Sequence, residues 1–385
     1  MKNVKPIWKP QYRVTTDMVR CLMDIEAIRT TVGQAALTTA VEAKLHRQAR
    51  LHATHYSTRI EGNRLTLAET EQVIQGRGVE FQGRERDVLE VRYYWDALLK
   101  VEAWAATKRP LTENLIRRLH GLVEHGPRSR PTPFRDGQNV IRDSASGAIV
   151  YMPPEPSDVL RLINELVNWV SWAEKTGVPV PLVAGLLHYQ FVTIHPYYDG
   201  NGRTARLLAT FILQRGGYGL QGFFSLEEFH ARDLTAYYRA LATHPHHNYY
   251  EGRANADLSS WMNYFLSTLA GAFGEVRDSV TRHTGQNLIV EPDFIRHLDH
   301  RSRIALSLFG NRETVTNVEV AQALGLSMRM ARVLIKRWVD GGMLVVTAAA
   351  RRNRAYGLSA IYRQYLDDLS AIRPIGDRRT RPLLE

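Results

Sequence analysis

The sequence predicts a mainly helical protein that carries one β-hairpin and ends in a separate winged helix-turn-helix domain. Apolar residues recur at three- and four-residue steps through most of the first 285 residues, as in amphipathic helices. Residues 137–154 are the exception, because two β-prone runs there surround a turn-rich centre. After about residue 290 the pattern is helix, tight turn, helix and basic hairpin, which is the order of a winged helix-turn-helix.

The changes in pattern define four expected regions along the 385 residues. They are an N-terminal helical region at 1–110, a core region that includes the hairpin at 111–285, the winged helix-turn-helix at 290–370 and a basic tail at 371–385. A chain of this length is long enough to bury more than one core.

Five helices of the first two regions are predicted from periodicity and end signals. They are expected at residues 37–63, 66–76, 157–177, 181–194 and 202–217. Thr66 and Glu69 stand at capping-box spacing. Ser157 is the expected N-cap of the third helix and Gly177 its terminator. The last two helices are apolar, so we expect them at the centre of the core.

The hairpin is expected at about residues 139–153. Pro153, Pro154 and Pro156 follow its second β-prone run and prevent the strand from continuing.

The C-terminal quarter is the most basic part of the chain. The formal net charge is +11, and residues 291–385 hold fifteen Arg and one Lys against ten acidic residues. The basic side chains of the expected recognition helix and wing are Arg329, Arg332, Lys336, Arg337, Arg351, Arg352 and Arg354. An acidic partner such as nucleic acid would suit them. Protein docking, pairing with a second copy as a homodimer, and a merely solvated basic face remain alternatives.

Cysteine usage and hydropathy indicate the cellular setting. Cys21 is the single cysteine, which excludes an internal disulfide framework and a cysteine-based zinc site. No apolar run has membrane-spanning length, and the first residues lack a signal-peptide core. We expect a cytoplasmic protein without a membrane partner.

The segment "TIHPYYDGNGRTAR" concentrates groups suited to phosphates. Gly200 and Gly202 let backbone N–H groups approach a ligand at the start of a helix, where unpaired N–H groups and the dipole favour anions. Arg203 and Arg206 lie one turn apart on that helix, and two guanidinium groups there suit two or more phosphates.

The remaining polar residues of the segment supply the chemistry. Asp199 offers the hard oxygen ligand that Mg²⁺ on phosphates would require. His195 can accept a proton near neutral pH, and Asn201 adds amide donors. Together these groups indicate attack by a hydroxyl on a polyphosphate, which is phosphoryl or nucleotidyl transfer. The alternative is a Gly-Asn-Gly turn that joins two core helices and is solvated by the arginines.

"HPYYDGNGRTAR" resembles the Fic motif, His-Pro-Phe-x-Asp/Glu-Gly-Asn-Gly-Arg-x-x-Arg, with Tyr197 in place of Phe. The Fic-like part covers about residues 40–270. The resemblance implies a helical Fic fold and transfer of AMP from ATP to a Tyr, Thr or Ser hydroxyl of a target protein, which could be the chain itself. Gly202 stands where the kinase branch of the family has Lys, which favours AMP transfer.

The resemblance also implies roles for individual residues. His195 would be the general base, and Asp199 would hold Mg²⁺. The ATP and phosphate contacts would come from Gly200, Asn201, Gly202, Arg203, Thr204, Ala205 and Arg206.

Two further segments resemble Fic elements. Residues 139–153 match the flap that holds a target's backbone by strand addition, with Ile149 and Val150 as clamps. "DLTAYYRAL" resembles the segment near the nucleoside, where Tyr238, Tyr237 and Asn255 are candidates; core packing of the tyrosines is the alternative.

"STRIEGN", residues 57–63, resembles the inhibitory-helix motif of Fic proteins, Ser/Thr-x-x-x-Glu-Gly/Asn. A glutamate at a helix end can pair with an arginine through two parallel hydrogen bonds. If Glu61 engages Arg206, that arginine cannot hold the γ-phosphate and transfer is blocked; Ser57 belongs to the same motif. Alternatively, Glu61 positions a water that removes AMP from targets, or the chain is a DNA-binding regulator that acts through its winged helix.

Overall fold

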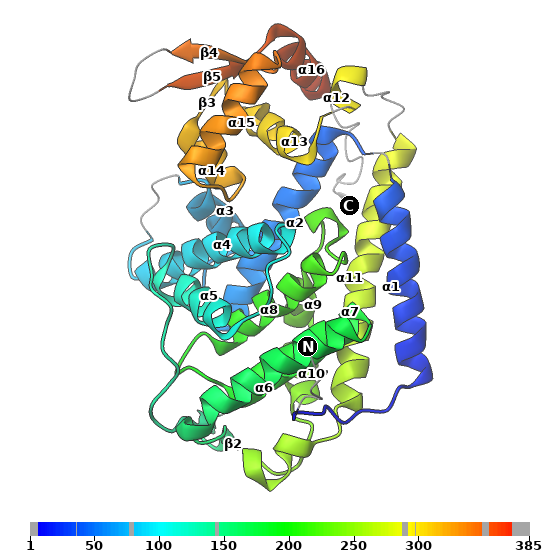
Figure 1. The fold of residues 1–385 in the computed structure, drawn as a ribbon, viewed down its shortest axis with the longest axis vertical. Coiled ribbons are helices and arrows are strands. Elements are labelled where there is room, and N and C mark those ends of the chain that lie inside the picture. Colours follow the sequence, from blue (N-terminus) through cyan, green and yellow to red (C-terminus); the bar gives the residue numbers. More distant parts are fainter. Residues whose placement is uncertain are drawn as a thin grey trace, which may run out of the picture. The chain divides into compact units, whose positions relative to one another are not determined.

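The fold is described here from a computed structural model of the 385-residue chain, which divides into two compact units (Figure 1). The described residues are 7–35, 37–76, 81–142, 146–286, 292–296, 298–348 and 354–371. The first unit holds the described residues of 7–35 and 45–286, and the second holds 37–44 and those from 292 onward. Apart from residues 37–44, the described residues of the regions expected at 1–110 and 111–285 therefore share one unit.

The first unit is built from helices, several of them longer than four turns. In chain order the helices up to the hairpin are α1 (Thr16–Gln34), α2 (Thr39–Ile60), α3 (Leu67–Ile74), α4 (Glu85–Ala106) and α5 (Glu113–His125). Those after the hairpin are α6 (Pro156–Lys175), α7 (Val180–Ile194), α8 (Asn201–Arg215), α9 (Leu226–Arg232), α10 (Leu234–Leu241) and α11 (Ser259–Gln286). Short 3₁₀ turns lie at Leu220–Gly222, Tyr249–Glu251 and Arg253–Asn255.

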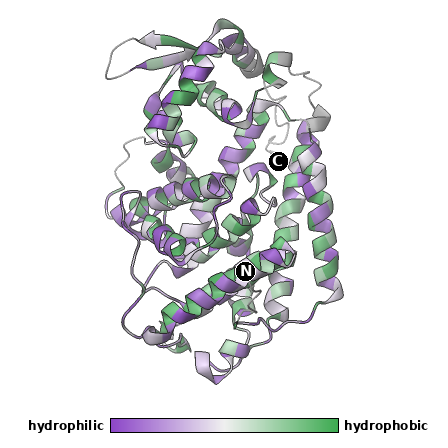
Figure 2. Ribbon diagram, viewed as in Figure 1, coloured by the Kyte–Doolittle hydropathy of each residue, from purple (hydrophilic) through white to green (hydrophobic). Residues whose placement is uncertain are grey.

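The helices α7 and α8 form the centre of this unit, as predicted from the apolar runs in both. Nearly every residue of both is buried, and they pack against each other while α4 packs on α8. The other helices are amphipathic, and most carry both hydrophilic and hydrophobic residues in Figure 2. Helices α1 and α11, distant in sequence, run side by side (Figure 1).

The predicted helix ends are confirmed with one exception. Thr66 and Glu69 form the predicted capping box of α3. The prediction of Ser157 as a cap is wrong, because α6 begins at Pro156 with Glu155 in the cap position. Proline fixes a helical φ and lacks the N–H that the first turn leaves unpaired, so it starts the helix one residue before the serine.

The hairpin lies where the sequence predicts it. Strands β1 (Ile141–Arg142) and β2 (Ile149–Tyr151) pair antiparallel, with Ile141 opposite Tyr151. Met152 continues the second arm by hydrogen-bonding to the backbone of His247 and Tyr249.

The second unit combines short helices with a small sheet. Its helices are α12 (Asp293–Arg296), α13 (His300–Ser307), α14 (Asn317–Ala323), α15 (Met328–Asp340) and α16 (Ala360–Ala371), with a 3₁₀ turn at Leu308–Asn311. Its strands are β3 (Thr314–Thr316), β4 (Leu344–Ala348) and β5 (Ala355–Leu358), in the antiparallel order β3-β5-β4.

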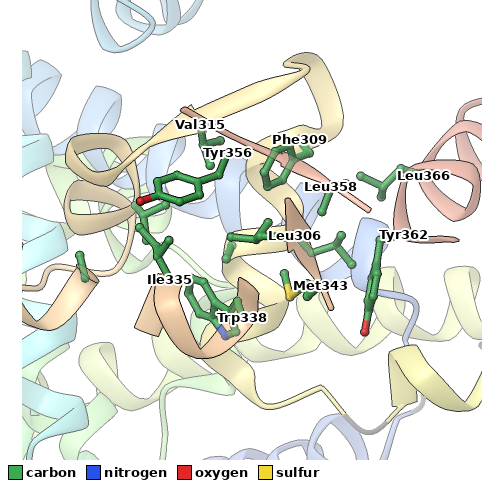
Figure 3. Packing of buried hydrophobic residues seen from close by; sticks show 14 of the residues in the cluster. Leu306, Phe309, Val315, Ile335, Trp338, Met343, Tyr356, Leu358, Tyr362 and Leu366 are labelled. Carbon is green, nitrogen blue, oxygen red and sulfur yellow. The ribbon is translucent and has the colours of Figure 1, made fainter. Parts of the chain in front are cut away.

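Apolar side chains from these helices and strands meet in one core, seen in Figure 3, where Leu306, Ile335, Trp338 and Tyr356 point toward one another. Gly325, in the turn between α14 and α15, has a φ of 61°, a left-handed conformation that favours glycine. The helix, turn, helix and hairpin follow in the predicted order, and their assignment as a winged helix-turn-helix stays a prediction. Arg351, Arg352 and most of the tail at 371–385 lie outside the described residues.

None of the helices in the described part of the chain combines the length and the apolar character that crossing a bilayer requires.

Candidate active site

His195 ends α7 and stands at the centre of the candidate site. It occupies the C-cap in the left-handed region, with φ 50°, and its backbone N–H donates to the carbonyl of Phe191. This conformation is strained for a non-glycine residue and commonly marks a functional position. The Nδ1 atom lies 3.3 Å from the carbonyl oxygen of Val192. Because a carbonyl only accepts hydrogen bonds, Nδ1 carries the hydrogen and Nε2 keeps its lone pair.

Burial lowers the pKa of His195 to about 4, and the nearby Arg135 guanidinium adds to this. The imidazole is therefore neutral at neutral pH. A neutral ring with Nε2 unprotonated is the form that can accept a proton from a hydroxyl.

The loop after His195 is held by its own side chains. Asn201 accepts from the N–H of Tyr197 at 3.0 Å and donates to the Tyr197 carbonyl at 2.8 Å. The ring of Tyr197 stacks on His120, with ring centroids 3.5 Å apart, and His120 Nε2 hydrogen-bonds to the carbonyl of Asp199. The Asn201 side chain, predicted to contact phosphate, is thus engaged in shaping the loop.

The helix α8 starts from a glycine cap. Gly200 has a φ of 72°, and its carbonyl accepts from the N–H of Thr204. Thr204 and Ala205 are buried, so any contribution of theirs to phosphate binding would have to come from the backbone. In this first turn, the N–H groups of the helix are the natural anion donors.

Arg203 is buried and surrounded by carboxylates. Its Nη2 lies 2.9 Å from Glu124 and 3.4 Å from Asp199, and its Nη1 lies 3.8 Å from Glu90. Glu90 lies on α4 and Glu124 on α5, so two helices besides α8, together with the loop that carries Asp199, contribute to this cluster. The structure therefore pairs Arg203 with acidic side chains, a set of partners that the motif did not indicate.

Asp199 is the exposed carboxylate of the loop. Its Oδ1 accepts from the N–H of Gly200 at 2.6 Å, and its Oδ2 lies 3.2 Å from Arg86 of α4. The described residues contain no cluster of three or more His, Cys, Asp or Glu side chains able to hold a metal.

Arg206 forms hydrogen bonds with residues at the C-terminal end of α2. Its Nε donates to the Ser57 hydroxyl at 2.8 Å, and its Nη2 donates to the Ser57 carbonyl at 2.9 Å and to Glu61 Oε1 at 2.8 Å. Only 2% of Arg206 is exposed, and although burial opposes its charge, Glu61 holds the pKa of Arg206 above its ordinary value. Arg206 thus divides its donors between Ser57 and Glu61, whereas the sequence predicted a two-bond pair with Glu61.

The predicted nucleoside residues lie in different environments. Tyr237 is 2% exposed and hydrogen-bonds to His188 at 2.9 Å, which matches the core-packing alternative. Tyr238 is 50% exposed, and Asn255 is also exposed. Burial, and Glu61 nearby, raise the pKa of Tyr238.

The segment that leads into the hairpin is joined to the loop before α8, and the second strand of the hairpin is accessible. Ile149 is half-buried and Val150 is 46% exposed, so their strand is accessible. The hydroxyl of Tyr198 accepts from the N–H of Gly137 at 2.7 Å and donates to Asp136 at 2.8 Å.

Four charged residues around the site were missed by sequence reasoning, namely Arg86, Glu90, Glu124 and Arg135. The first three are single charged residues on amphipathic helices, a pattern typical of solvated surface. Arg135 had one available signal, since it directly precedes the hairpin and is followed by an Asp-Gly turn.

Part of the chain is similar to known proteins. Residues 110–213 match the family model described as the Fic/DOC family. The protein adenylyltransferase Fic of Drosophila virilis is 30% identical over 211 residues, which are 53% of this chain and 42% of that protein. The protein of the same name from Drosophila willistoni is 29% identical over 211 residues, which are 53% of this chain and 41% of that protein. The chain thus spans less than half the length of these curated relatives.

Two solved structures have a similar fold. A Fic family protein from Desulfovibrio desulfuricans G20 has a TM-score of 0.57 at 24% identity, covering 92% of this chain and 99% of that one. Fic-1 from C. elegans, residues 134–508, has a TM-score of 0.53 at 22% identity, covering 70% and 72% of the two chains.

Proposed function

We propose that this protein, a Fic-domain protein distantly related to protein adenylyltransferases, transfers AMP from ATP to a hydroxyl side chain of a protein. The observation that carries the proposal is the neutral His195, whose Nε2 is free to accept a proton and which the short loop of residues 196–200 links to the N-terminus of α8. A base and an anion-binding helix start are the two parts that nucleotidyl transfer needs.

In the proposed reaction, the target's hydroxyl oxygen attacks the α-phosphorus of ATP while His195 Nε2 takes the hydroxyl proton. The new bond joins that oxygen to the α-phosphorus. The bond from the α-phosphorus to the bridging oxygen breaks, and pyrophosphate leaves. The first N–H groups of α8 stabilise the charge on the phosphate oxygens.

Asp199 is the proposed magnesium ligand. Magnesium in phosphate-transfer sites is usually held by one or two carboxylates together with substrate phosphates, so a single exposed carboxylate before the helix start fits. The ion would neutralise charge on the phosphates. To bind it, Asp199 would give up its contact with Arg86.

We propose that Glu61 inhibits transfer in cis. Because Ser57 and Glu61 accept hydrogen bonds from the Arg206 guanidinium, those N–H groups are already occupied before a nucleotide binds. If Arg206 does not hold the γ-phosphate, ATP binds in an orientation in which the α-phosphorus is not in line with the attacking hydroxyl. Inhibition ends when the Glu61 carboxylate moves away from Arg206.

The test uses Glu61→Gly protein with Mg²⁺ and α-labelled ATP, with and without a cell lysate, followed by intact mass and label detection. Glu61→Ala is the matched variant, because it removes the carboxylate without the extra backbone freedom of glycine. We expect labelling in both variants, little in the wild type, and none after His195→Ala in the same backgrounds. Absence of labelling in every case contradicts the proposal. If the wild type releases AMP from a modified substrate and Glu61→Gly does not, the reaction is removal of AMP instead.

A second function is favoured by the surface of α15. Arg329, Arg332 and Lys336 are exposed, recur at three- and four-residue steps, and form no ion pair with a described residue. Buried Ile335 and Trp338 occupy the opposite side of this helix. An exposed basic helix face suits the phosphates of duplex DNA.

Retardation of duplex DNA by the full chain tests this second function. We expect binding that weakens with salt and is lost in the double variant Arg332→Glu/Lys336→Glu. Arg118→Glu, an exposed residue of α5, is the matched control. Absence of binding at low salt favours a protein-docking role.

A further inference from the structure

We infer that Arg135 is a positioning residue that fastens the backbone of His195 to both ends of the flap hairpin. This inference rests on the proposed function, in which His195 is the base and the flap holds the target. It concerns a residue outside the motif, on the segment that leads from α5 into the hairpin.

The hydrogen bonds of Arg135 reach three places. Its Nε donates to the carbonyl of His195 at 2.9 Å. Its Nη1 donates to the carbonyl of Gly137, at the entry to the hairpin, at 3.0 Å. Its Nη2 donates to the carbonyl of Pro154, at the exit of the hairpin. Its backbone N–H donates to the carbonyl of Pro196 at 2.9 Å, next to the base.

The chemistry of arginine suits this arrangement. The guanidinium is planar and holds its donors in a fixed fork, so three carbonyls bonded to it are fixed relative to one another. Arg135 is 4% exposed, and burial lowers its pKa. No carboxylate of the described residues forms an ion pair with it, so the buried charge is solvated by the three backbone carbonyls and by the side-chain oxygen of Gln138, 3.1 Å from Nη1.

The position of these carbonyls has a consequence for the reaction. His195 holds a left-handed backbone conformation, and a bond to its carbonyl restricts the peptide that follows. The same guanidinium fixes the arms that carry β1 and β2. Arg135 therefore sets the distance and orientation between the base and a target strand on the flap, and geometric control of that kind is a large part of catalysis.

The kinetic test compares Arg135→Lys and Arg135→Gln, both in the Glu61→Gly background. Arg128→Lys, an exposed arginine without a side-chain partner among the described residues, is the matched control. We expect kcat for AMP transfer to fall by about a hundredfold in both Arg135 variants, with the Kd for ATP unchanged. In Arg135→Gln the acid limb of the pH profile should move to higher pH, because loss of the cation raises the pKa of His195. In Arg135→Lys the acid limb should not move, because the positive charge is kept. Rates and a pH profile equal to those of Arg128→Lys overturn the inference.

A second measurement does not depend on activity. Hydrogen–deuterium exchange of the full chain is followed in peptides covering 134–139, 149–155 and 194–199, with α6 as the reference. We expect exchange to increase together in the three segments in Arg135→Lys, and not in α6 or in Arg128→Lys. Unchanged exchange in all three overturns the inference even if AMP transfer occurs. If Glu61→Gly shows no AMP transfer, the proposed function fails, and the exchange result still decides the role of Arg135.

Discussion

The carboxylate of Glu61 lies against the backbone of Gly202, so that a Cβ added at position 202 would be 2.2 Å from Glu61 Oε1. The same Cβ would be 3.1 Å from Nη1 of Arg206. The ion pair between Glu61 and Arg206 thus needs a residue without a side chain at position 202. This requirement is steric, because Gly202 has no left-handed φ that would itself demand glycine.

Gly202→Ala should therefore have opposite effects in two backgrounds. In the wild type it should lower the free energy of unfolding, because the methyl group displaces Glu61. In Glu61→Ala it should be neutral or stabilising by up to about 1 kcal/mol, since alanine is the better helix former. Urea unfolding of the four proteins measures the coupling, expected at about 1–3 kcal/mol. Equal effects of Gly202→Ala in both backgrounds would show that Glu61 does not occupy this space in solution.

Ser57→Ala should release Arg206 in part. The change removes the acceptor of the Arg206 Nε but leaves the Ser57 carbonyl and Glu61 in place. A buried donor left without a partner costs about 1–3 kcal/mol, so we expect a loss of stability of that order. We expect AMP transfer above that of wild type and below that of Glu61→Gly, measured with α-labelled ATP. Ser267→Ala, whose hydroxyl bonds its own helix, is the control. Transfer at the wild-type level would mean that Ser57 does not help to hold Arg206.

Tyr197→Phe should be neutral or stabilising by about 1 kcal/mol. The Tyr197 hydroxyl is buried and finds no hydrogen-bond partner among the described residues, and burial raises its pKa. Removing an unpaired buried hydroxyl removes a desolvation penalty. Thermal unfolding checks this, and Tyr94→Phe is the contrasting control, because the Tyr94 hydroxyl bonds Glu227 at 3.0 Å and its loss should destabilise. A clear loss of stability in Tyr197→Phe would reveal a partner for that hydroxyl.

Stability should decrease as the solution becomes acidic below pH 6.5. Burial lowers the pKa of His188 to about 3 and the pKa of His55 and His120 to about 4. Below pH 6.5 the unfolded chain therefore binds protons at these histidines that the folded protein does not bind. Linkage then makes the free energy of unfolding fall toward pH 4, by at most about 1.4 kcal/mol per pH unit for each group.

Urea unfolding at pH 7, 6 and 5 measures this dependence. His188→Gln removes one of the buried titrating groups and should reduce the slope by one proton. A free energy of unfolding that stays constant between pH 6.5 and 5 would contradict the neutral, buried state of these histidines.

Local sequence signals predicted a large part of the fold. The capping box at Thr66 and Glu69, the apolar helices α7 and α8 and the hairpin all depend on residues close together in the chain. The misplaced start of α6 has the same origin, since Ser157 and Pro156 are both good starting residues and the proline is used. The burial of Tyr237 depends instead on His188, 49 residues away.

The sequence by itself determined which chemical groups gather between His195 and Arg206, because the glycines, the histidine, the carboxylate and the two arginines are neighbours in the chain. Only the tertiary structure decided which groups those residues meet. Arg206 contacts Glu61 across 145 positions, Arg203 meets acids from α4 and α5, and the carbonyl of His195 meets Arg135 across 60 positions. The physical reason is that a guanidinium hydrogen-bonds to whatever acceptors packing brings within about 3 Å, and sequence spacing carries no record of that distance.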